Sequence, residues 1–72
     1  MEELLKILNE AVDNVDFKNE KNLVDDGLLD SLDIVRIIEL IEEHYNVEIS
    51  PDMIDPDNFQ SAEIILNMIQ NL

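Results

Sequence analysis

The chain has 72 residues, of which 46% are apolar and only three are aromatic, and its eighteen acidic and four basic side chains give a formal net charge of −14. This charge repels nucleic-acid phosphates and anionic lipid headgroups, so neither nucleic acid nor membrane is an expected partner, whereas proteins with basic patches are favoured. The absence of cysteine excludes disulfides and thiolate metal sites, so any chemistry that needs a thiol must import one.

The first predicted element is an amphipathic helix near residues 2–15, in which apolar residues recur at spacings of three and four. Those residues are Leu4, Leu5, Leu8, Ala11, Val12 and Val15. Glu2 and Glu3 stand where a signal peptide would carry basic residues, and no apolar stretch approaches the ~20 residues of a membrane span. We expect a single cytoplasmic domain, residues 1–72, that is a monomer and does not insert into membranes.

The apolar period breaks between Asp16 and Asp30, which predicts a long ordered loop. Loops of this length in small domains are usually functional or packed by their own side chains. Asp30 is then a favourable N-cap for a second helix, which Asn46 is expected to end. The apolar surface of this helix is wider than one stripe, so it is predicted to be the central helix.

Two further elements are predicted downstream. Ser50 followed by Pro51 predicts a short helical turn, which Pro56 is expected to end. A last amphipathic helix follows Ser61 and extends toward Leu72. The predicted fold is therefore all-α, a four-helix bundle with a long loop between the first two helices, a short third helix, and a core of Ile, Leu and Val.

The sequence lacks the usual reagents of an enzyme. Its one histidine, His44, lies among acidic residues late in the second helix, with no nucleophile or triad partner near it. A core this small cannot enclose a substrate and two buried acids, so most carboxylates are expected to form a solvated face. The segment Asp25-Asp26-Gly27 lacks the ligand spacing of a calcium loop. We expect neither catalytic residues nor a metal site.

The remaining candidate for chemistry is the segment Gly27-Leu28-Leu29-Asp30-Ser31-Leu32-Asp33. A serine at the start of a helix lies where backbone N–H groups are unpaired and the helix dipole is positive, so a phosphodiester formed on it would be accommodated. The alternative interpretation is that Asp30 and Ser31 only cap the helix. Three residues alone do not decide between the two.

With the order of the predicted helices, this segment resembles the acyl carrier protein family, and the resemblance covers nearly the whole chain. The matching residues are Gly27, Leu28, Asp30, Ser31, Leu32 and Asp33, followed by Glu42-Glu43-His44-Tyr45 and Val47-Glu48-Ile49. The resemblance implies that a phosphopantetheinyl transferase attaches 4'-phosphopantetheine from coenzyme A to Ser31. It also implies that Asp30 helps that enzyme and its magnesium engage, and that Leu32 anchors docking.

The resemblance further implies a carrier that holds acyl intermediates as thioesters in fatty acid, polyketide or related biosynthesis. Acyl- or aminoacyl-activating and transferring enzymes with basic patches would then meet an acidic surface, which raises encounter rates and selects partners. That surface is expected to comprise Asp33, Glu39, Glu42, Glu43, Asp52 and Asp55, with Asp57 extending it. An aliphatic core, in which Val35 and Ile38 face Ile54 and Ile65, is expected to shelter the attached chain.

Two departures from the family pattern leave the pathway open. Arg36 stands where carriers of fatty-acid synthesis usually present an acid, and His44 interrupts a common acidic run. Residues 54–61 are also similar to a stretch of D-alanyl carrier proteins, so an aminoacyl carrier for cell-wall or peptide biosynthesis is the second hypothesis. A third is an acidic helical adaptor with no prosthetic group, which modification of Ser31 would exclude.

Overall fold

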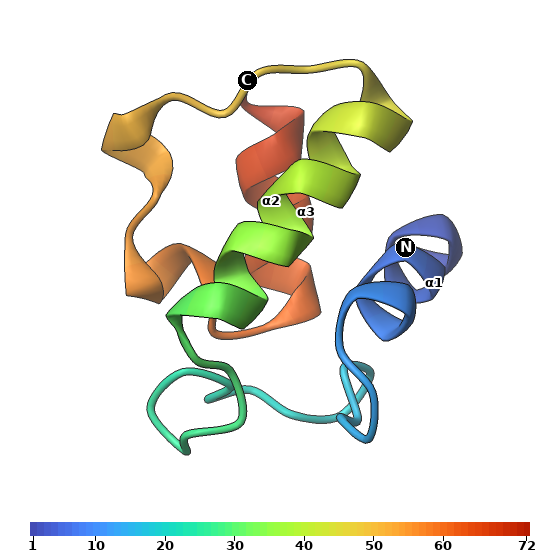
Figure 1. Cartoon of the computed structure of the whole chain (residues 1–72), viewed down its shortest axis with the longest axis vertical. Coiled ribbons are helices and arrows are strands. Elements are labelled where there is room, and N and C mark those ends of the chain that lie inside the picture. Colours follow the sequence, from blue (N-terminus) through green and yellow to red (C-terminus); the bar gives the residue numbers. More distant parts are fainter.

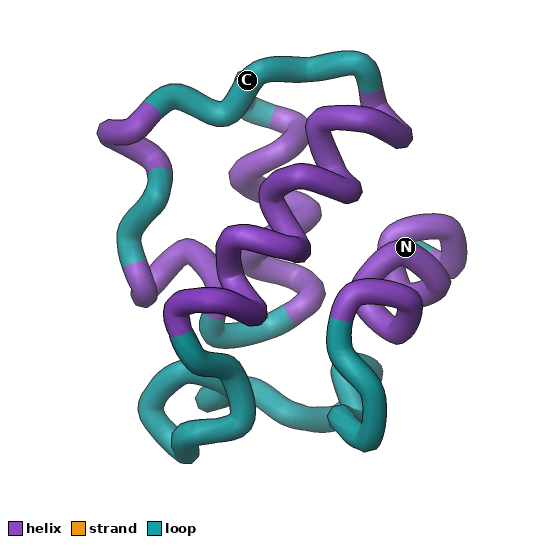
Figure 2. Tube along the Cα trace, in the orientation of Figure 1, coloured by secondary structure: helices purple, strands orange, loops and turns teal.

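A computed structural model describes all of residues 1–72 and contains only helices, turns and loops (Figures 1 and 2). The elements are α1 (Glu2–Ala11), α2 (Ser31–Tyr45), η1 (Pro51–Met53), η2 (Pro56–Phe59) and α3 (Ala62–Gln70), where η denotes a 3₁₀-helix. The fold is therefore all-helical, as predicted. The α-helices number three rather than four, because two short 3₁₀-helices occupy the place of the predicted third helix.

Helix α1 is shorter than predicted. It ends at Ala11 because Val12 adopts an extended conformation, and Asn14 is left-handed with φ 65°. Asparagine tolerates this conformation better than most residues. Val12 and Val15 still pack against the core from the turn, so the apolar period continues beyond the end of the helix.

Helix α2 begins and ends where the sequence predicts. Asp30 is its N-cap, and Asn46 ends it in a left-handed conformation with φ 53°. Asparagine is one of the residues that commonly terminates a helix in this way. The chain then turns, and the Ile49 N–H donates a hydrogen bond of 2.9 Å to Glu42 Oε2. This bond ties the segment after the helix back to its last turns.

The segment after α2 differs from the prediction at Pro56. The first turn, η1, starts at Pro51 as expected, but Pro56 opens η2 rather than ending a helix. A proline fits the first helical position because its missing N–H would have no partner there. Asp55 caps η2 by accepting a 2.9 Å hydrogen bond from the Asp57 N–H.

Helix α3 follows its predicted cap. The Ser61 hydroxyl accepts a 3.1 Å hydrogen bond from the Ile64 N–H, and the helix runs to Gln70. Helix α1 packs against both α2 and α3. The three α-helices thereby enclose one core.

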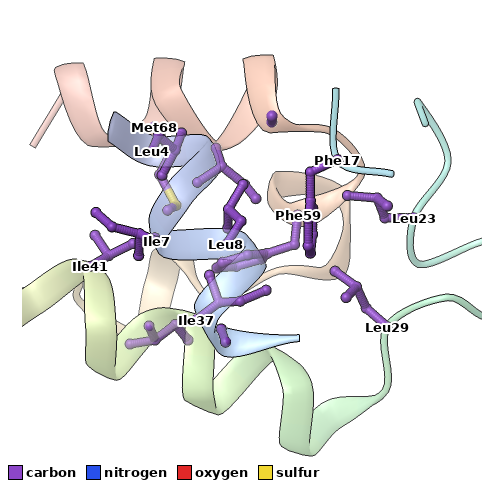
Figure 3. Close-up of a cluster of buried hydrophobic side chains, with 14 of the residues drawn as sticks. Leu4, Ile7, Leu8, Phe17, Leu23, Leu29, Ile37, Ile41, Phe59 and Met68 are labelled. Carbon is purple, nitrogen blue, oxygen red and sulfur yellow. The ribbon is translucent and has the colours of Figure 1, made fainter. Parts of the chain in front are cut away.

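The core is mostly aliphatic, but it includes two aromatic side chains that the composition argument left out. Phe17 from the α1–α2 loop and Phe59 from η2 are almost completely buried (Figure 3). The other buried apolar residues are Leu4, Ile7, Leu8, Ala11, Leu23, Leu29, Ile37, Ile38, Ile41, Ile49, Ala62, Ile65 and Met68. The expectation of a core built from Ile, Leu and Val alone was therefore wrong.

The segment that joins α1 to α2 is held in place by Gln60. Its side-chain Oε1, in a residue that is only 7% exposed, accepts hydrogen bonds from the N–H groups of Val24 and Asp25, at 3.0 and 3.2 Å. Its backbone carbonyl accepts a further bond from the Leu23 N–H. The Leu23 carbonyl in turn accepts from the N–H of Leu29, one residue before the cap of α2. Gln60, at the junction of η2 and α3, is thus connected through hydrogen bonds to the residues that precede α2.

We expect Gln60→Ala to lower the free energy of unfolding by about 1 to 3 kcal/mol, because two backbone N–H groups lose their acceptor. The matched control is Gln70→Ala, which removes an exposed glutamine at the end of α3. Urea denaturation followed by circular dichroism measures both. Equal free energies of unfolding for the two variants would show that the Gln60 side chain does not stabilise the segment between α1 and α2.

The melting temperature should rise with salt, because Lys21–Glu63 is the only ion pair in a chain of net charge −14. Counterions screen repulsion between the other acids, with a Debye length of ~10 Å at 0.1 M. Thermal melts in sodium chloride and in magnesium chloride at equal ionic strength separate screening from specific magnesium binding. A melting temperature that stays flat or falls between low and moderate salt would contradict this expectation.

Candidate functional site

Ser31 is the first residue of α2, and its hydroxyl takes no part in capping the helix. Asp30 Oδ1 accepts a 2.8 Å hydrogen bond from the Asp33 N–H, and Asp33 Oδ2 accepts a 3.2 Å bond from the Asp30 N–H. This reciprocal pair is a capping box. Because the two aspartates complete the cap, the exposed Ser31 hydroxyl has no hydrogen-bond partner within the chain. Of the two residues proposed as caps, only Asp30 acts as one.

The backbone around Ser31 suits an anionic ester. The N–H groups of Ser31 and Leu32 find no acceptor within the chain, since the cap bonds begin at the N–H of Asp33. The positive end of the helix dipole also lies here. Free N–H groups at such a terminus commonly bind phosphate. The start of α2 therefore fits a phosphodiester on Ser31 without any neighbouring cationic side chain.

A shallow groove of about 240 Å³ adjoins Ser31. It lies between the first turns of α2 and the stretch that leads from η1 into η2. Its lining residues are Ser31, Ile34, Val35, Ile54, Asp55 and Pro56. The side chains of Val35 and Ile54 are 48% and 44% exposed, so they form a surface groove. An apolar surface thus begins directly beside the serine.

The groove corrects the expectation of a shelter inside the core. Val35 and Ile54 do line one space together, as predicted. Ile38 and Ile65 are instead buried in the main core and do not line the groove. The four side chains are therefore split between a surface groove and the core: Val35, at the edge of the buried face of α2, is 48% exposed, whereas Ile38 is only 9% exposed.

The residues predicted to contact partners fall into two groups. Leu32 is 74% exposed beside Ser31, and Glu39, Glu43 and Asp52 are exposed and make no hydrogen bond through their side chains. The second group consists of Asp33, Glu42 and Asp55, and each of these carboxylates accepts a hydrogen bond from a backbone N–H. These three therefore have a structural role in addition to any contact with a partner.

The titratable groups give no sign of an acid–base centre in the groove. The pKa of Tyr45 is raised by burial and by the nearby charge of Glu3. The pKa of Glu63 is lowered, chiefly by the hydrogen bond from Lys21. Neither residue lines the groove. His44 is exposed, no cluster of potential metal ligands occurs, and no helix is long and apolar enough to cross a membrane.

Two features of the site were missed by the sequence interpretation. Asp33 was assigned to a partner surface, although an acid three residues after an N-cap is the pattern of a capping box and could have been recognised. The role of Gln60 had no such signal, because its acceptors lie 35 and 36 residues away along the chain. Only the tertiary structure brings that amide to the loop.

The sequence matches, over residues 1–64, the family described as "Phosphopantetheine attachment site". The chain belongs to this family. It is 37% identical over 62 residues to the acyl carrier protein of Campylobacter lari, which covers 86% of this chain and 78% of that relative. It is 36% identical over 66 residues to an acyl carrier protein of Buchnera aphidicola, covering 92% and 78%. No solved structure gives a significant match.

Membership of the phosphopantetheine family confirms the resemblance drawn from the sequence. The prosthetic group of the family is a covalently attached 4'-phosphopantetheine, and the acyl carrier proteins that the chain resembles are carriers rather than enzymes. The chain is thus an acyl-carrier-type phosphopantetheine protein. This role implies a phosphopantetheinyl transferase and acyl-handling enzymes as partners in general.

Proposed function

We propose that the prosthetic group is attached to the Ser31 oxygen, and that the chain delivers acyl thioesters to partner enzymes in fatty acid, polyketide or related biosynthesis. The observation that carries this proposal is the exposed Ser31 hydroxyl, which the Asp30–Asp33 capping box leaves free at the start of α2. When bound, the group supplies a terminal thiol that forms thioesters. The chain itself contributes the attachment point, the nearby groove and the docking surface.

Attachment requires one exchange of bonds at Ser31. The bond from its oxygen to phosphorus forms as the pyrophosphate link of coenzyme A breaks, and the adenosine bisphosphate half leaves. The hydroxyl proton is proposed to pass to a base of the transferase. The unpaired N–H groups of the first turn of α2 would stabilise the new phosphodiester.

Asp30 and Leu32 are proposed to assist the transferase. One carboxylate oxygen of Asp30, Oδ1, holds the cap, whereas Oδ2 makes no hydrogen bond within the chain. Oδ2 is therefore free to face the magnesium ion of the transferase, since carboxylate oxygens are preferred magnesium ligands. The largely exposed side chain of Leu32 stands next to the reacting hydroxyl, where an apolar pocket of the enzyme would bury it.

The acidic residues are proposed to guide later partners. Glu39, Glu43 and Asp52 are exposed and free of hydrogen bonds, so they are the best placed to meet basic patches. Asp33, Glu42 and Asp55 add negative charge to the same surface, and each also accepts a hydrogen bond from a backbone N–H. Charge of this kind speeds encounter more than it tightens binding.

The aminoacyl carrier is the second candidate, on the basis of the similarity of residues 54–61 to D-alanyl carriers. The groove favours the acyl carrier, because Ile34, Val35 and Ile54 offer an aliphatic surface to an aliphatic cargo. A short amino acid with a charged amine would gain little from the same surface. An adaptor without a prosthetic group does not agree with membership of the family.

We expect Ser31→Ala to abolish attachment of phosphopantetheine and to change the free energy of unfolding by no more than about 0.5 kcal/mol, because the serine is exposed and does not cap the helix. Intact mass spectrometry after incubation with coenzyme A and a transferase measures attachment, and circular dichroism measures stability. Ser50→Ala is the matched control and should be modified like the wild type. Continued modification of the Ser31→Ala variant would overturn the assignment.

Loading with a medium-length acyl chain should shift the NMR signals of the Val35 and Ile54 methyl groups, and loading with alanine should leave them unchanged. The reason is that only the longer cargo removes apolar area from water by lying in the groove. Ile7 of α1, which does not line the groove, is the control methyl. If neither cargo moves the Val35 and Ile54 signals, the groove holds no cargo, and the aminoacyl hypothesis gains support.

A further inference from the structure

Arg36 is an isolated positive charge in the acidic segment formed by residues 22–72. Residues 22–72 contain twelve acidic side chains but only one lysine or arginine, which is Arg36. The three lysines, Lys6, Lys18 and Lys21, all precede residue 22. The only arginine or lysine of this acidic segment therefore lies on α2, the helix that begins with Ser31.

The guanidinium of Arg36 forms no ion pair, although acids stand three residues away on either side. Lys21–Glu63 is the only ion pair in the chain. Asp33, three residues before Arg36, instead directs its carboxylate to the Asp30 N–H. Glu39, three residues after it, is exposed and unbonded. The Arg36 guanidinium is thus exposed and unpaired within the chain, so it is available to form an ion pair with a carboxylate of another protein.

Arg36 belongs to one exposed stripe of α2. Leu32, Arg36, Glu39 and Glu43 follow one another at spacings of four, three and four, so they share a face of the helix, and all are exposed. We call these four residues the α2 stripe. Arg36 lies five residues from Ser31, or about 7.5 Å along the helix axis. Around the axis, Arg36 is rotated about 140° from Ser31 but only about 40° from the exposed Leu32, so a protein that contacts both Ser31 and Leu32 through a patch of ~800 Å² also reaches Arg36.

We propose that the phosphopantetheinyl transferase that loads Ser31 presents a carboxylate to Arg36, within a surface that is otherwise basic toward Glu39 and Glu43. This inference rests on the proposal that Ser31 is the attachment site. The transferase is the partner of choice because it must form a bond to the Ser31 oxygen itself, so it has to cover the first turns of α2. Enzymes that act on the distant end of the arm have no such constraint.

The paired charges would make the α2 stripe selective. A transferase with a uniformly basic surface would repel the Arg36 guanidinium, whereas one with a carboxylate at that point would gain a close charge pair. Like charges that face each other at an interface are unfavourable and exclude wrong partners. Arg36 is therefore a specificity-determining residue for loading rather than a catalytic one.

The test compares Arg36→Glu and Arg36→Gln with Lys6→Glu and Lys6→Gln, using coenzyme A and the transferase encoded in the same genome. Lys6 is an exposed cation on α1, so each pair changes net charge equally. We expect Arg36→Glu to raise the KM for the carrier at least about tenfold with little change in kcat, the size expected for a lost close charge pair. Arg36→Gln should raise KM less. The Lys6 variants should load like the wild type.

An Arg36→Glu variant that loads as well as Lys6→Glu, or better, would overturn the proposal, because it would show that the transferase is basic or neutral at this point. Circular dichroism melts check folding, because Arg36→Glu adds a negative charge near Asp33 and Glu39 and the resulting repulsion could destabilise α2. Arg36→Gln removes the positive charge without adding this repulsion, so it tests the proposal even if Arg36→Glu is unstable. Replacing one transferase Asp or Glu by Lys should restore loading of Arg36→Glu, and failure of every such replacement would also count against the proposal. Failure of the wild type to load at Ser31 is a different result, which would refute the proposed function itself.

Discussion

Two reciprocal hydrogen bonds between Asp30 and Asp33 fix the residue at which α2 begins. Because these two side chains complete the cap, the Ser31 hydroxyl remains free, and the first N–H groups of the helix stay open toward solvent. The α2 stripe and the groove beside Ser31 depend on the same register. A start shifted by one residue would rotate every α2 side chain by about 100° around the helix axis and carry Val35 away from Ile54.

The cap is in turn supported by a residue that is distant in the sequence. Gln60, at the junction of η2 and α3, accepts hydrogen bonds from the N–H groups of Val24 and Asp25. The Leu23 carbonyl accepts a hydrogen bond from the N–H of Leu29, which immediately precedes Asp30. Phe59, next to Gln60, is fully buried in the core. The reacting end of α2 is therefore connected to the core by a short series of backbone bonds. This arrangement lets a small domain hold an exposed serine in a defined position.

Local chemistry determined what could be predicted from the sequence. The cap at Asp30 and the end of α2 at Asn46 were identified correctly, because each depends on side-chain and backbone preferences within a few residues. The end of α1 and the role of Gln60 were not identified, because Val12 continues the apolar pattern from an extended turn and Gln60 acts across 35 residues or more. Composition alone did not reveal that the fold brings Phe17 and Phe59 to its centre, because it gives the number of aromatic residues but not their positions in the fold. Ser31 was assigned through its motif and the helix that follows it.

Attachment of phosphopantetheine to Ser31 is tested most directly by tandem mass spectrometry of the wild-type chain after incubation with coenzyme A and a transferase. The chain has three serines in different environments: Ser61 is a buried cap, Ser50 is exposed before η1, and Ser31 is exposed at the start of α2. We expect one modification, on the peptide that contains Ser31. Modification of Ser50 or Ser61, or an unmodified chain under conditions that load the Campylobacter lari acyl carrier protein, would contradict the assignment.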